Sequence, residues 1–180
     1  NDAATTAIYT DGHVATAGEE LVRADLCQEA IRLTRLVVDL LPDAAEAQGL
    51  LALLLLTDAR RPARTDPDGT PISLEDQDRG RWDRDAIVEG TAVLDHALAQ
   101  GPAGPFLVQA AVAALHAEAA SWDATDWPQI AALYGELHRL APSPVVTLNR
   151  AAALAQADGP HVGLALLATL EDDERLTGGS

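Results

Sequence analysis

Several residue types are scarce in this sequence, and each shortage excludes a class of protein or structure. The only cysteine, Cys27, rules out an internal disulfide and a zinc site built from several cysteines. This usage fits a reducing compartment, so a cytoplasmic protein is expected. Aromatic residues make up only 3% of the chain, whereas hydrophobic residues make up 48%. Alanine, leucine and valine must therefore fill the core, which favours closely packed helices over sheets.

Lysine and methionine are absent. All twelve basic residues are arginine, and together with 28 acidic residues they leave a net charge of −16. A surface this acidic repels phosphate backbones, so direct binding of DNA or RNA is not expected. The richest apolar run, Gly49 to Leu56, is far shorter than the ~20 residues needed to cross a membrane. Without methionine, the chain is expected to be an internal part of a longer protein.

Hydrophobic spacing predicts a series of helices separated by proline and glycine. Apolar residues recur every three or four positions over residues 16–41, which predicts a helix with one apolar face. The next helix is expected over residues 43–58, and its leucines surround it almost completely, as in a helix buried on most sides. Asp43 and Glu46 have the spacing of a capping box at its start. Further helices are expected at about 86–100, 105–121, 127–141, 145–157 and 161–170.

A pattern from the first part of the chain returns later. A helix that ends before Pro42 precedes a helix that ends at Asp58, and the same arrangement recurs at Pro142 and Asp158, 100 residues further on. Helix pairs of this kind are typical of tetratricopeptide repeats, which stack into a superhelix with a concave face that holds a protein segment. The sequence therefore predicts an all-α single domain of antiparallel helix pairs, with about seven to eight helices.

One long segment, about residues 62–82, has no predicted helix. It separates a first helical half (about 1–61) from a second (about 83–170), which a solvated tail from 171 to 180 follows. The segment is rich in proline, aspartate, threonine and glycine, and the weak alternation of residues 70–74 also allows a short hairpin. Loops of this length inside a compact helical domain are usually functional or disordered.

Six of the twelve arginines lie within this loop and its borders, interleaved with acidic residues. Because arginine pairs well with carboxylates, the first interpretation is a salt-bridge network that fastens the loop to the helices as a structural clasp. A contact with a protein partner and a site for an anion or a metal ion are the alternatives. Trp82 is either a core anchor or an interface residue. The candidate residues are Arg60, Arg61, Arg64, Asp76, Asp78, Arg79, Arg81 and Trp82.

Motifs for catalysis, cofactor binding or metal binding are not found. The sequence has no glycine-rich phosphate loop, no His-Glu-x-x-His and no Gly-x-Ser-x-Gly. His116-Ala117-Glu118 matches the His-x-Glu of zinc deaminases, but those enzymes also need a Pro-Cys-x-x-Cys that one cysteine cannot supply. We therefore expect a non-enzymatic protein without cofactor, in which His116 is a helix-packing residue.

Three segments resemble motifs of one known family. They are Asp58-Ala59-Arg60-Arg61-Pro62-Ala63-Arg64, Leu74-Glu75-Asp76-Gln77-Asp78-Arg79-Gly80-Arg81-Trp82-Asp83 and Leu140-Ala141-Pro142-Ser143-Pro144-Val145-Val146-Thr147-Leu148-Asn149-Arg150. The family is the C-terminal, tetratricopeptide-like extension of extracytoplasmic-function sigma factors, common in actinobacteria. The resemblance covers about Ile8 to Leu170. The segment Tyr9-Thr10-Asp11-Gly12-His13 departs from the Phe-Asn-Glu-Gly-Tyr that is usual in the family.

The resemblance implies a regulatory domain that acts by protein contact. Its expected partners are the protein's own N-terminal sigma regions, core RNA polymerase or a regulator protein, with no direct DNA binding and no membrane. The sigma regions that bind DNA are absent from this chain. Two alternatives remain open at this point: an anion-binding, small-ligand or enzymatic helical domain that uses the arginine cluster, and a generic tetratricopeptide adaptor unrelated to transcription.

Overall fold

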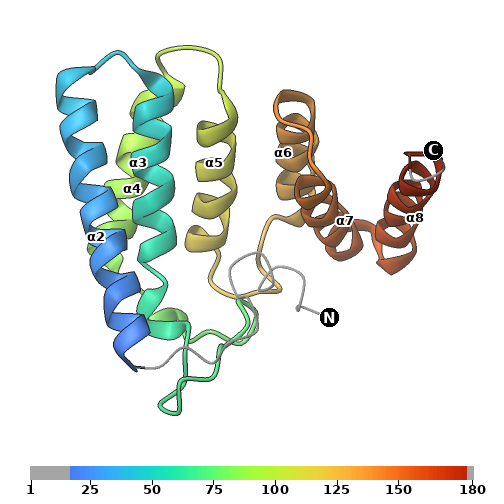
Figure 1. Cartoon of the computed structure of the whole chain (residues 1–180), viewed down its shortest axis with the longest axis horizontal. Helices are drawn as coiled ribbons and strands as arrows, with labels where there is room; N and C mark the ends of the chain where they lie inside the picture. The colour runs from blue at the N-terminus through green and yellow to red at the C-terminus, as the bar shows by residue number, and fades with distance from the viewer. Residues whose placement is uncertain (1–16, 178–180) are drawn as a thin grey trace.

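The computed structural model describes residues 17–177, with side chains from Arg23 to Thr169, and there it contains seven α-helices and no strand (Figure 1). Expectations for residues 1–16 lie outside this part of the chain. The all-α prediction is confirmed. No helix among the described residues is both long and apolar enough to cross a membrane. The helices are α2 (Ala17–Leu40), α3 (Ala45–Asp58), α4 (Arg84–Leu98), α5 (Pro105–Glu118), α6 (Trp127–Leu140), α7 (Pro144–Asp158) and α8 (Pro160–Thr177).

Helix ends agree closely with the sequence pattern. α2 ends at Leu40 and α6 at Leu140, and the helices that follow them end at Asp58 and Asp158. The predicted repeat is therefore present as two matching helix pairs. The last helix differs, because α8 continues to Thr177. The segment predicted as a solvated tail from residue 171 is helical as far as that residue.

Consecutive helices pack against one another. α5 joins the two parts of the stack, because it contacts α3 and α4 on one side and α6 on the other. α3 lies at the centre of a bundle with α2, α4 and α5, and α6, α7 and α8 continue from α5 (Figure 1). Val112 on α5 is buried together with Ile130 and Ala131 of α6 and Ala153 of α7. Helices from before and after the loop share one core, since α4 and α5 pack directly on α3.

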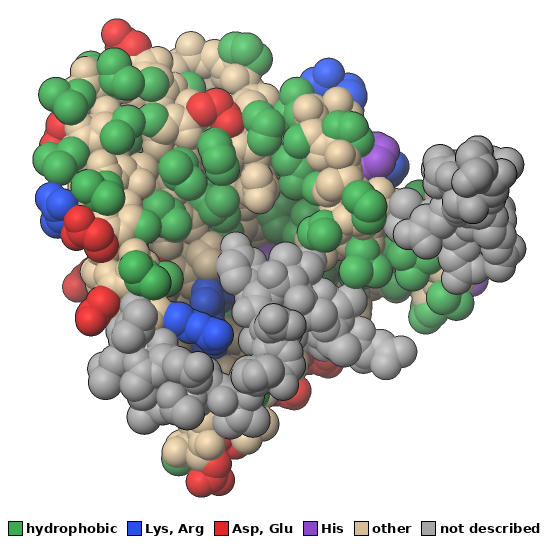
Figure 2. Space-filling model, viewed as in Figure 1, with side chains coloured by type: hydrophobic (Ala, Val, Ile, Leu, Met, Phe, Trp, Pro, Cys, Tyr) green, Lys and Arg blue, Asp and Glu red, His purple; other side chains and the backbone are tan. Residues whose placement is uncertain are grey.

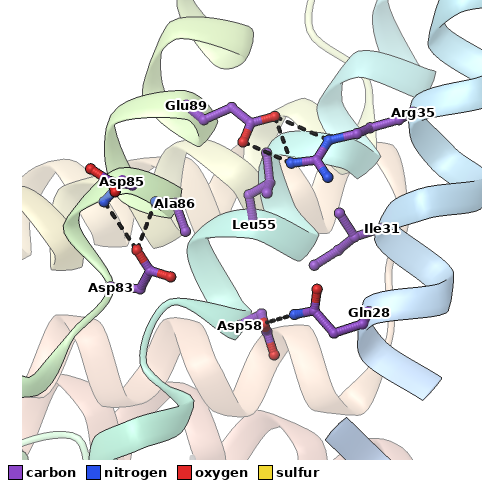
Figure 3. Close-up of a pocket in the computed structure, with 9 residues that line it drawn as sticks. All are labelled: Gln28, Ile31, Arg35, Leu55, Asp58, Asp83, Asp85, Ala86 and Glu89. Atoms are coloured by element: carbon purple, nitrogen blue, oxygen red, sulfur yellow. Dashed lines mark hydrogen bonds and ion pairs between the residues drawn. The ribbon is translucent and has the colours of Figure 1, made fainter. Parts of the chain in front are cut away.

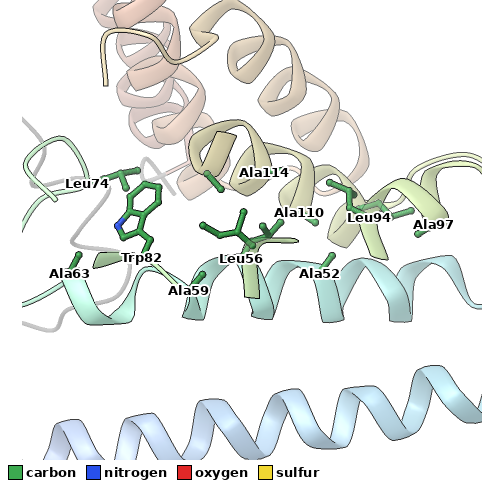
Figure 4. Packing of buried hydrophobic residues seen from close by; sticks show 13 residues of the cluster. Ala52, Leu56, Ala59, Ala63, Leu74, Trp82, Leu94, Ala97, Ala110 and Ala114 are labelled. Carbon is green, nitrogen blue, oxygen red and sulfur yellow. The ribbon is translucent and has the colours of Figure 1, made fainter. Parts of the chain in front are cut away.

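One side of α3 is buried against α4 and α5. Ala52, Leu56 and Ala59 are at most 1% exposed and lie in one core cluster with residues of α4 and α5 (Figure 4). The opposite side of α3 meets α2, where Leu51 and Leu55 pack against Ile31. The prediction that this helix is buried on most sides is confirmed.

Glu46 on α3 caps the N-terminus of a different helix, α5. Its Oε2 accepts the backbone N–H of Phe106 at 2.9 Å, and its Oε1 accepts that of Leu107 at 3.2 Å. The N-cap of α3 itself is Ala44, with no side-chain hydrogen bond, so the predicted capping box of Asp43 and Glu46 is not formed. A carboxylate at this position satisfies two N–H groups that lack helical partners and suits the positive end of the helix dipole.

Replacing Glu46 by alanine is expected to lower the free energy of unfolding by about 1–2 kcal/mol, because two N–H groups of α5 lose their acceptor. Glu46→Gln keeps one acceptor oxygen and should cost less. Urea unfolding followed by circular dichroism measures both values. Glu75→Ala, on the exposed side of the loop, is the control. Equal stability of Glu46→Ala and the wild type would contradict the capping role.

Candidate functional site at the arginine cluster

The loop that carries the arginines is ordered by short local contacts. It contains two 3-10 turns, η1 (Arg61–Ala63) and η2 (Arg79–Arg81). Between them, Asp66 Oδ1 accepts the backbone N–H groups two and four residues later, at 2.9 and 2.8 Å. Thr65 and Pro71 form an isolated antiparallel bridge. The hairpin that the sequence allowed is thus reduced to this one bridge.

Trp82 anchors the loop in the core. Its side chain is 3% exposed and shares the main core cluster with Ala63 and Leu74 of the loop and with Ala59 just after α3 (Figure 4). The guanidinium carbon of Arg79 lies 4.6 Å from the centre of the indole ring. At this distance the cation is attracted to the face of the ring. Trp82 is therefore a core residue that also supports Arg79.

Arg79 binds the C-terminal end of α5. Its Nη1 donates hydrogen bonds to the backbone oxygen of His116 and, at 3.0 Å, to that of Ala119. Carbonyl groups in the last turn of a helix lack helical partners, and a cation is favoured at this end of the helix dipole. Burial, with the nearby charge of Arg84, lowers the pKa of Arg79. Together with Glu46, Arg79 places side chains from other segments at both ends of α5.

Two other predicted arginines tie the loop to the end of α3. Arg61 Nε lies 3.2 Å from Asp58 Oδ1, and Arg64 Nη2 donates to the backbone oxygen of Thr57 at 2.5 Å. In the part of the chain that the structure describes, the loop is fastened by this ion pair and by arginine-to-carbonyl bonds. Beyond this pair, the arginine–aspartate network that the sequence suggested stays a prediction.

Four candidates remain: Arg60, Asp76, Asp78 and Arg81. Asp78 caps η2 by accepting the N–H of Gly80 at 2.9 Å, and Asp76 accepts a hydrogen bond from the hydroxyl of the serine three residues earlier at 2.8 Å. Arg81 is exposed, and Arg60 is half-buried. Arg79 and Trp82 thus contact the core and the end of α5, Arg61 and Arg64 contact the end of α3, and Asp76, Asp78 and Arg81 lie exposed on the loop.

Sequence reasoning missed the aromatic residues that lie beside the arginines. The ring of His116 is 5.4 Å from that of Trp127 and 6.3 Å from that of Trp122, and the two indoles are 4.4 Å apart. A signal was present, because the whole chain has only three tryptophans, two tyrosines and one phenylalanine. Two tryptophans five positions apart are conspicuous in such a sequence.

The environment of the cluster suppresses ionisation of its rings. Burial, together with the charges of Arg60 and Arg79, lowers the pKa of His116 to about 3. Burial raises the pKa of Tyr134 to about 12, although Arg60 opposes this. A general acid or base works best with a pKa near the working pH, so neither ring suits proton transfer at neutral pH.

The low pKa of His116 predicts acid sensitivity. The unfolded chain binds a proton on this ring below about pH 6.5, whereas the folded protein does so only near pH 3. Its contribution to stability is therefore complete above pH 6.5 and is lost as the pH falls towards 3. The stability of the wild type should fall more steeply over this window than that of His116→Gln, by on the order of 3 kcal/mol at pH 4.

Urea unfolding at a series of pH values measures this difference, and His161→Gln, at an exposed position, is the control. The control should follow the wild type at every pH. Parallel stability curves for the wild type and His116→Gln would contradict the assignment.

A second group of charged residues lines a cavity of about 200 Å³ between α2, α3 and the start of α4 (Figure 3). Arg35 binds Glu89 across it through two nitrogens, Asp58 accepts a hydrogen bond from Gln28 at 2.8 Å, and Asp83 caps α4. These carboxylates are engaged in structural contacts. Among the described residues, no group of three or more His, Cys, Asp or Glu side chains is arranged to hold a metal ion.

Fold and site define an all-α protein of stacked helices, with a charged side chain bound at each end of α5. The chain belongs to the family of unknown function DUF6596, which matches residues 3–98. An uncharacterized protein of Rhizobium meliloti (strain 1021) is 49% identical over 171 residues, or 95% of this chain and 40% of the relative. The chain thus spans less than half the length of that relative. No solved structure matches it.

Proposed function

We propose that this chain is a regulatory, protein-interaction domain of a sigma factor that directs RNA polymerase to promoters. It acts by contact with the sigma regions of its own protein, core RNA polymerase or a regulator. The observation that carries the proposal is that two of the three sigma-factor-like segments, residues 58–64 and 74–83, lie inside the family match over residues 3–98. Domains of this family occur C-terminal to sigma-70 regions in some sigma factors. The proposal implies a cytoplasmic location.

The loop offers a surface suited to such a contact. Its buried residues hold it against α3 and α5, while Arg61, Asp76, Asp78 and Arg81 are exposed on it. A surface that is already ordered loses little conformational entropy on binding. The net charge of −16 supports binding to protein in preference to nucleic acid.

The proposal is tested by pull-down of the chain with separately produced sigma regions and with core RNA polymerase. Arg81→Glu should weaken binding by about tenfold or more, because it reverses an exposed charge on the loop and leaves the Arg61–Asp58 ion pair in place. Arg139→Glu, an exposed arginine on α6, is the matched control. Binding of neither partner, in cis or in trans, would refute the proposal. A mobility-shift assay with promoter DNA should show no complex.

Anion or small-ligand binding, including an enzymatic role, is the second candidate. In the described part of the chain, Nη2 of Arg79 and Nε1 of Trp82 are buried donors without a hydrogen-bond partner. They belong to side chains that stack on each other, and oxygen atoms of an anion are suitable acceptors for both. Phosphate and citrate should then raise the melting temperature of the wild type more than that of Trp82→Phe, which lacks the indole donor. No shift, or equal shifts, would exclude this candidate.

A further inference from the structure

α2 has a wide apolar arc, and only one side of it is covered. Ile31 is 3% exposed and packs on α3. The adjacent side is open, and Figure 2 shows hydrophobic side chains along the edge of the molecule where α2 lies. Six large hydrophobic residues there, 42–79% exposed, make up what we call the α2 face: Leu26, Leu33, Leu36, Val37, Leu40 and Leu41.

The spacing within this face is that of a helix-pairing seam. Leu26, Ala30, Leu33, Val37 and Leu40 follow one another at steps of four, three, four and three residues. This is the alternation of a and d positions in a coiled coil, which keeps apolar residues on the line that faces a second helix. The seam extends over roughly 21 Å of helix, at 1.5 Å per residue. Its shape therefore suits another helix better than a flat or globular partner.

The area of the α2 face is close to what a stable dimer requires. Six side chains at these exposures present on the order of 600 Å² of apolar surface. This area is near the upper end of the range found for the largest apolar patch on typical monomers. A standard interface buries about 800 Å² on each partner, including a polar rim. The α2 face supplies most of this area before any rim residue is counted.

We propose that the α2 face is the interface of a homodimer, in which α2 of one copy packs antiparallel on α2 of a second copy. A two-fold axis at Leu33 makes the face complementary to itself, with Leu26 opposite Leu40 of the second copy. A parallel arrangement would instead place like charges together and align the two helix dipoles. The inference does not rest on the proposed function.

Analytical ultracentrifugation of the whole chain tests the proposal. The wild type should be a dimer that tightens as salt increases, because salt screens the repulsion between two copies of charge −16 while the apolar contact remains. Leu33→Asp should raise the dissociation constant on the order of 100-fold or more, since each dimer loses two buried leucines. Leu33 is 48% exposed in one copy, so the variant should keep its helix content by circular dichroism.

Val88→Asp is the matched control, because Val88 is 69% exposed but lies on α4, outside the α2 face. It should dimerise as the wild type does. A wild-type chain that stays monomeric up to roughly 1 mM would overturn the proposal, and so would equal loss of dimer in the two variants. If a longer natural form of the protein is monomeric while this chain dimerises, another part of the polypeptide occupies the face, and the homodimer is refuted.

Discussion

Trp82→Ala is expected to lower the free energy of unfolding by about 3–5 kcal/mol, the usual cost of removing a buried tryptophan. Native domains are stable by only about 5–15 kcal/mol, so this loss is large. The indole fills the space between the loop and the end of α3, and it supports the guanidinium of Arg79. Its removal should therefore also weaken the contact at the C-terminal end of α5. Urea unfolding followed by circular dichroism measures the loss.

Two variants separate this packing role from other effects. Trp82→Phe keeps a large ring and removes the unpaired buried N–H, so it should cost clearly less than alanine. Arg81→Ala changes an exposed neighbour and should stay within about 0.5 kcal/mol of the wild type. A Trp82→Ala protein within about 1 kcal/mol of the wild type would show that the loop does not depend on this anchor.

Gly49→Ala is expected to destabilise the protein by about 1–3 kcal/mol through overpacking where α3 crosses α5. A Cβ at this position would lie 2.8 Å from the backbone nitrogen of Leu107 and 2.9 Å from its Cγ. The nitrogen belongs to the backbone of α5, so the two helices must move apart. Leu107 also donates its N–H to Glu46, and the clash should weaken that bond.

Gly135→Ala is the matched control on α6. The nearest atoms to its added Cβ are 3.6 Å away, in the guanidinium of Arg150, which is ordinary contact. Alanine inside a helix is favoured over glycine by about 0.5–1 kcal/mol, so this variant should gain stability. Thermal unfolding of both variants measures the two effects, which have opposite signs. A stabilising Gly49→Ala would show that α3 and α5 are not in such close contact.

Helix positions could be predicted because their signals are local. Proline and glycine mark the ends, and Ser143 caps α7 by accepting the N–H of Val146, within one turn. Asp43 and Glu46 have a similar local spacing, yet Glu46 binds α5, 60 positions away in sequence from Phe106. A carboxylate near the start of one helix can accept the free N–H groups of that helix or those of a neighbouring helix. Only the packing of α3 on α5 decides between them.

The arginine cluster could be located from composition, but its contacts could not be predicted. The acceptors of Arg79 are backbone oxygens at the end of α5, 37 and 40 positions away. Every residue has a backbone oxygen, so no sequence pattern marks these partners. The neighbouring aspartates suggested carboxylate partners instead. His116 was correctly expected to be a packing residue, but its low pKa depends on the arginines that the fold brings near it.

The contacts of Glu46 and Arg79 with the two ends of α5 require this helix to keep its length. Glu46 holds its first turn from α3, and Arg79 holds its last turn from the loop. One residue inserted between these points would lengthen the helix by about 1.5 Å and rotate one end by about 100° relative to the other. Only one of the two contacts would then keep its geometry. Natural insertions and deletions in relatives that align over the whole chain should therefore avoid α5, even though they are tolerated in loops at the surface.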